Sequence, residues 1–132
     1  VQAGLRQPGM WLTRPASDMR LENWKESDIT QTLNTMRAVF NEEPAGDGYY
    51  VSMPGMFHDN FTDAPYFTPL GPLLGFTGPM NAQRGFDIIN AYSLAFFDQY
   101  LGGRPVALLD GPAKQYPEVL FSVNGIGQKL LP

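Results

Sequence analysis

Residues 9–13 (GMWLT) and 49–53 (YYVSM) are two short apolar runs, rich in aromatic side chains in the second case, and each is bounded by proline or glycine. Both patterns predict β-strands. Between them, apolar residues recur at spacings of 4, 3 and 4, which lays one apolar stripe along a helix that follows Ser27 as N-cap and ends near residues 41–44. The stripe consists of Ile29, Leu33, Met36 and Phe40.

A strand, a helix and a second strand form a βαβ unit, which determines where functional side chains gather. The crossover requires parallel strands and is overwhelmingly right-handed, so the loops after both strands lie at the same edge of the sheet. Ligands of open α/β sheets bind at this carboxyl edge. We therefore expect the loop at residues 15–18 and the loop at residues 54–62 to be neighbours.

The rest of the chain predicts a single α/β domain. Residues 57–78 are typical of an ordered loop with one helical turn at residues 70–74, and a long helix is expected at about residues 79–101. Two later apolar runs, residues 106–109 and 119–123, are expected to lie extended on the surface. We thus predict one domain over residues 1–132, with a core at about 8–101, a short parallel sheet with flanking helices, and an extended tail at 102–132.

Composition excludes several classes of function. The net charge of −4 without a cluster of Lys or Arg argues against nucleic-acid binding. No apolar stretch approaches the roughly 20 residues of a membrane span. With no Cys and one His, cysteine-type zinc sites and histidine-rich metal sites are excluded, and no cofactor motif is present. Because the chain opens with Val1 and shows no signal-peptide pattern, we expect a processed or excised segment.

His58 is the candidate for acid–base chemistry, because it is the one imidazole and follows the second strand by five residues. An imidazole accepts and returns a proton near neutral pH, as a general base must. The competing interpretation is a surface or capping histidine. Asp18, expected in the loop after the first strand, could orient the imidazole from the same edge, or it could form a local turn or cap. Asp59 and Asp63 are expected to shape the histidine loop.

A serine hydrolase also requires a nucleophile on a strand-to-helix elbow, usually within G-x-S-x-G. No such motif occurs, and none of the five serines stands in a comparable pattern. The chain therefore lacks a recognisable nucleophile.

The stretch GMFHDNFTD at residues 55–63, followed by a helix containing DIINAYSLAFFDQYL at residues 87–101, resembles the end of α/β-hydrolases. It is most similar to the group around dienelactone hydrolase and the plasma-type platelet-activating-factor acetylhydrolases. That group has a G-x-x-H-x-N-F-x-D stretch carrying its catalytic histidine, and the positions matched here are His58, Asn60, Phe61 and Asp63.

The resemblance, which covers about residues 8–109, implies that His58 is the base of a serine esterase acting on a small acyl ester. In many hydrolases the acid follows the strand where Asp18 lies. In the acetylhydrolases it follows the preceding strand, which would place it upstream of Val1. The nucleophile and the oxyanion hole would also come from an N-terminal portion, so this chain would be inactive by itself.

Two hypotheses follow. In the first, the chain is the C-terminal segment of a serine esterase and its partner is the N-terminal portion of that enzyme. In the second, it is a non-catalytic module that associates with a second copy of itself through an open sheet edge or the long helix.

Overall fold

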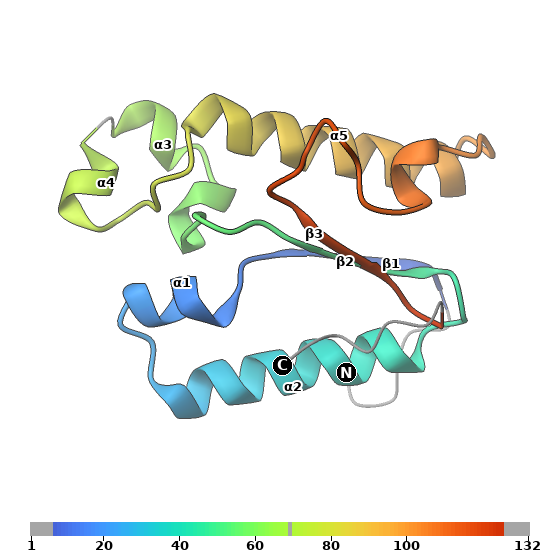
Figure 1. The fold of residues 1–132 in the computed structure, drawn as a ribbon, viewed down its shortest axis with the longest axis horizontal. Coiled ribbons are helices and arrows are strands. Elements are labelled where there is room, and N and C mark those ends of the chain that lie inside the picture. Colours follow the sequence, from blue (N-terminus) through green and yellow to red (C-terminus); the bar gives the residue numbers. More distant parts are fainter. Residues whose placement is uncertain (1–6, 69, 126–132) are drawn as a thin grey trace.

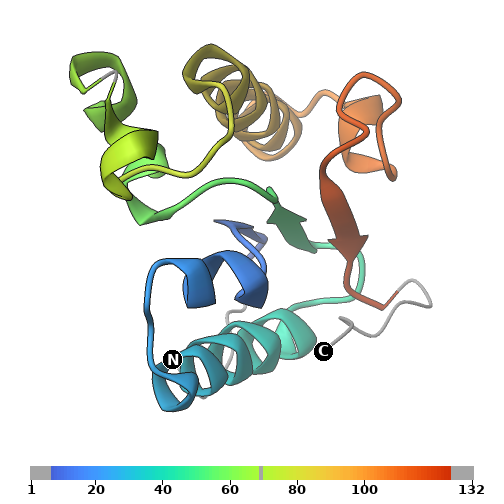
Figure 2. The same cartoon turned by 60° about the vertical axis from the view of Figure 1, so that its left-hand side comes forward.

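The computed structural model describes residues 7–68 and 70–125. Its elements form three layers, with a small sheet in the middle (Figure 1). Helices α1 (Ala16–Leu21) and α2 (Glu26–Glu42) cover one face of the sheet, and α5 (Ala82–Tyr100) covers the other. The view in Figure 2 shows the same separation of α2 from α5 by the sheet.

The predicted βαβ unit is present. Strands β1 (Gly9–Thr13) and β2 (Gly48–Ser52) pair in parallel, with Gly9 opposite Gly48 and Thr13 opposite Ser52. Helix α2 provides the crossover between them. The predicted α/β class is confirmed, and both carboxyl ends lie at one edge of the sheet.

The tail differs from its expected place on the surface. Leu120–Val123 forms β3, which pairs antiparallel with β2, so the sheet is mixed and its order is β1-β2-β3. Phe121 and Val123 are buried in the hydrophobic core. The prediction of a surface location was wrong because these alternate side chains point to one face of the strand and bury it against the core. On the side away from β2, strand β1 has no strand partner among the described residues.

Helix α2 follows its predicted stripe, but its start does not depend on Ser27. The N-cap is Lys25, which makes no side-chain capping bond, and the buried residues are Ile29, Val39 and Phe40. Phe40 packs edge-on against Tyr50 of β2, with ring centroids 6.3 Å apart. Helix α1 was not expected, since residues 15–18 were predicted to form a loop.

Helix α5 forms the opposite layer and is capped by the Asn81 side chain, which accepts a hydrogen bond from the N–H of Arg84. The predicted start at Pro79 was therefore too early. The helix buries Ile88, Tyr92 and Ala95, and the Tyr92 ring stacks on Phe121 of β3 at 5.7 Å. This packing connects the tail to the core.

Short helices make up much of the remaining chain. They are η1 (His58–Phe61), α3 (Ala64–Phe67), α4 (Gly71–Leu74) and η2 (Ala107–Leu109). Of these, the turn at residues 70–74 was predicted, and η2 stands where an extended run was expected. In the described part of the chain, no helix is both long enough and apolar enough to cross a bilayer.

Candidate active site

The histidine loop leaves the carboxyl end of β2 and reaches η1, whose first residue is His58. Helix α1 follows the carboxyl end of the parallel strand β1, so α1 and the histidine loop share one edge of the sheet, as expected. The His58 side chain is exposed. An imidazole at this edge is accessible to a reacting group that approaches from outside the described chain.

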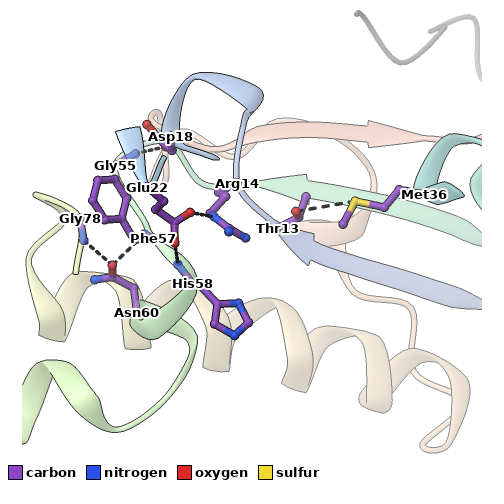
Figure 3. Close-up of polar contacts among 10 residues, drawn as sticks. All are labelled: Thr13, Arg14, Asp18, Glu22, Met36, Gly55, Phe57, His58, Asn60 and Gly78. Atoms are coloured by element: carbon purple, nitrogen blue, oxygen red, sulfur yellow. Dashed lines mark hydrogen bonds and ion pairs between the residues drawn. The ribbon is translucent and has the colours of Figure 1, made fainter. Parts of the chain in front are cut away.

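The structure gives Asp18 a different partner from the one expected. Asp18 is buried within α1, and its Oδ2 accepts a hydrogen bond of 2.7 Å from the backbone N–H of Gly55 in the histidine loop. Figure 3 shows the His58 imidazole pointing away from this carboxylate. No hydrogen bond joins the two side chains within the described residues. The shared edge was predicted correctly, but the structure does not bring the Asp18 carboxylate onto the imidazole.

Asn60 holds the histidine loop from within. It is buried, and its Oδ1 accepts hydrogen bonds from the N–H groups of Phe57, at 2.8 Å, and Gly78, at 2.6 Å. The second bond ties η1 to the segment that leads into α5 (Figure 3). A buried backbone N–H without an acceptor is costly. The Asn60 amide oxygen avoids this cost for two N–H groups at once, because it can accept two hydrogen bonds.

Gly78 fits closely against the same loop. A Cβ at this position would overlap the carbonyl oxygen of Gly55, and that oxygen accepts a hydrogen bond of 2.9 Å from the N–H of Met80. The absence of a side chain therefore allows the two backbone segments to meet.

Sequence reasoning did not identify two charged residues at this edge. Glu22, at the C-cap of α1, accepts a hydrogen bond from the backbone N–H of His58 and pairs with Arg14, which follows β1. Neither residue stands in a periodic pattern or a known motif, so the sequence carried no signal for this contact.

The serines do not provide an elbow. Ser52 lies within β2 and is buried, Ser122 lies within β3, and the other three lie within helices α1, α2 and α5. Among the described non-glycine residues, Asn23 has a positive φ, of 63°, and no serine does. The strained turn of a nucleophile elbow is thus missing from the described residues. Across the same residues, no three acidic, histidine or cysteine side chains converge as metal ligands would.

A parallel strand pair with helices on both faces, and a histidine loop beyond the second strand, fit part of an α/β-hydrolase fold. Platelet-activating factor acetylhydrolase of Cavia porcellus is 29% identical to this chain over 79 residues, which are 58% of the chain. A ferulic acid esterase from Streptomyces cinnamoneus matches 92% of the chain with a TM-score of 0.64 and 25% identity. No protein-family model matches the chain.

Both relatives are esterases of this fold type, so the resemblance inferred from the histidine loop and the long helix is confirmed. They support a hydrolase-type function. The chain spans 18% of the acetylhydrolase and 35% of the esterase chain.

Proposed function

We propose that this chain is the C-terminal segment of a carboxylic-ester hydrolase, in which His58 is the general base for a serine supplied by a preceding part of the protein. One observation carries the proposal. The loop of His58 is fixed at the carboxyl edge of a parallel strand pair by neighbouring polar groups, while its imidazole is exposed.

The chemistry would follow the usual course of acyl transfer. The serine Oγ gives its proton to the imidazole as it attacks the ester carbonyl carbon, and the imidazolium returns that proton to the departing alkoxide oxygen. Water then repeats the sequence on the acyl-enzyme and releases the acid. The chain's contribution is the base and the rigid loop that carries it.

The unpaired side of β1 is where we place the preceding part of the protein. A parallel sheet needs neighbours along its edges and cover on its faces, and β1 is paired on one side only within the described residues. A further parallel strand there would bring its own carboxyl end to the edge that carries His58. A serine after such a strand would then face the imidazole.

For the triad acid we propose a residue outside the described chain, with Asp18 in a positioning role. The Asp18 carboxylate is occupied by the N–H of Gly55. An acid that orients an imidazole must accept a hydrogen bond from its ring nitrogen.

The test is ester hydrolysis by the full-length protein, with p-nitrophenyl esters of short acids as substrates. His58→Ala should lower kcat about 10²- to 10⁴-fold or more, because a positioned general base contributes that much. Asp59→Asn is a matched control, since Asp59 neighbours His58 and its carboxylate makes no hydrogen bond among the described residues. Undiminished turnover of His58→Ala would refute the proposed role.

A second candidate function is favoured by an exposed apolar stripe on α5, formed by Leu94, Phe97 and Leu101. These residues recur at spacings of three and four, so they lie on one face of the helix. Such a face is suited to bury itself against a second copy of the chain, which would make this a non-catalytic, self-associating module.

A further inference from the structure

Glu22 contacts the backbone of His58 from the neighbouring crossover. Its Oε1 accepts a hydrogen bond of 2.6 Å from the His58 N–H, and its Oε2 pairs with Arg14 Nε at 2.5 Å. The side chains of Arg14 and Glu22 are 7% and 10% exposed, whereas the His58 side chain is exposed. Figure 3 shows the carboxylate between the guanidinium and the His58 backbone.

Arg14 is itself held in place from two sides. Its guanidinium pairs with Glu22 and lies over the Trp24 ring, 4.9 Å from the centroid. Because Arg14 directly follows the last residue of β1, the pair connects the end of one parallel strand to the loop after the other. The position of the His58 backbone is thus linked to the sheet.

The neighbouring Arg20–Glu26 ion pair differs from the Arg14–Glu22 pair in its exposure to solvent. Arg20 and Glu26 also pair at 2.6 Å, but their side chains are 54% and 65% exposed, and neither bonds the histidine loop. Exposed pairs contribute little to stability, and a buried pair carries a large desolvation cost that its attraction barely offsets. The buried Arg14–Glu22 pair is therefore better explained by the group it holds than by stabilisation of the fold.

We propose that Arg14 and Glu22 are positioning residues for His58, an inference that rests on the proposed esterase function. The carboxylate is a strong acceptor for the His58 N–H, and Arg14 restricts it to one orientation. Since the contact is made through the backbone, one imidazole nitrogen stays available for proton exchange with the serine and the other for a hydrogen bond to the triad acid. The position of a general base matters because a displacement of about 1 Å reduces the rate by about 10²-fold.

Amide hydrogen exchange in the full-length protein tests the contact without reference to catalysis. Glu22→Ala should speed exchange of the His58 amide about ten- to hundredfold, as expected for loss of one charge-assisted hydrogen bond. Glu22→Gln should restore part of the protection, because its amide oxygen can still accept from the same N–H. Glu26→Ala is the matched control and should leave this amide unchanged.

Steady-state kinetics of the same variants test the positioning role. Glu22→Ala should lower kcat with KM little changed, and Glu22→Gln should recover part of kcat, whereas Glu26→Ala should match the wild type. If Glu22→Ala fails to fold, Glu22→Gln and Arg14→Lys provide the same comparison. A folded Glu22→Ala enzyme with normal kcat and normal His58 exchange would overturn the inference.

The two proposals fail separately. Full activity of His58→Ala would remove the esterase role and leave the exchange result standing as a structural finding. Unchanged exchange of the His58 amide in Glu22→Ala would remove the positioning contact and leave the role of His58 untouched.

Discussion

The Asp18 carboxylate accepts a 2.7 Å hydrogen bond from the backbone N–H of Gly55, so the helix after β1 holds the loop after β2. Gly55 has a φ of 85°, a conformation that glycine adopts without strain. The bond therefore fixes the turn from which the histidine loop departs.

Replacing Asp18 should weaken the fold. Asp18→Ala leaves the Gly55 N–H without its acceptor and should lower the free energy of unfolding by about 1 to 3 kcal/mol. Asp18→Asn retains an oxygen acceptor and should lose less. Urea denaturation measures both, with the exposed Asp110→Ala as a control that stays within about 0.5 kcal/mol of the wild type.

Asp18→Asn also separates a positioning residue from a triad acid. An acid lost from a serine–histidine–acid triad lowers kcat by about 10⁴-fold even when the geometry is kept. If Asp18 only positions the loop, the kcat of the full-length Asp18→Asn enzyme should fall far less than that. A loss near 10⁴-fold would instead make Asp18 the acid.

The junction between η1 and α5 should tolerate no side chain at position 78. Gly78→Ala would drive a methyl group into the Gly55 carbonyl and disturb the bond from Gly78 to Asn60. We expect a loss of about 1 to 3 kcal/mol in unfolding free energy. Gly111→Ala is the control, because a Cβ there meets no atom within 4 Å. Equal stability of the two variants would contradict the described packing.

Local sequence patterns predicted the elements that have a strong periodic signal. The stripe of α2, the apolar runs of β1 and β2 and the long helix α5 were all read from spacing and composition. Helix α1 was missed because its six residues are too few for a periodic pattern. The run at residues 119–123 was expected to be extended, but its place in the sheet was missed because its pairing with β2 joins segments about 70 residues apart, which no local window reveals.

The candidate site was predicted only in part, for a similar reason. His58 and Asn60 stand in a recognisable motif, and the βαβ unit placed Asp18 at the right edge. The direction of each side chain depends on tertiary packing, so the contacts of Asp18 with Gly55 and of Glu22 with the His58 backbone were not foreseen.

Glu43 should make stability depend on pH. Its carboxylate is buried with no hydrogen-bond partner among the described residues, and burial, aided by nearby Asp47, raises its pKa from 4.5 to about 7. Between pH 4.5 and about pH 7, the folded state therefore keeps a proton on Glu43 that the unfolded state has already released. Stability from this group is fully present below pH 4.5 and is lost as pH rises through 7.

Glu43→Gln should remove this dependence. The variant should gain about 1 to 3 kcal/mol over the wild type at pH 8, where the wild type buries a charge, and little at pH 4. Urea denaturation at the two pH values measures the difference. The exposed neighbour Glu42→Gln serves as the control. A gain of equal size at both pH values would contradict a buried, protonated Glu43.

The apolar stripe of α5 distinguishes a self-associating module from a segment that needs the rest of an enzyme. If Leu94, Phe97 and Leu101 bury themselves against a second copy, Leu94→Glu places a charge in that interface and should convert a dimer of this chain to a monomer. Gln31→Glu, an exposed position on α2 across the sheet from α5, should leave the dimer intact. Light scattering over a concentration series measures the mass. A wild-type chain that stays monomeric at every concentration would count against self-association and favour the esterase segment.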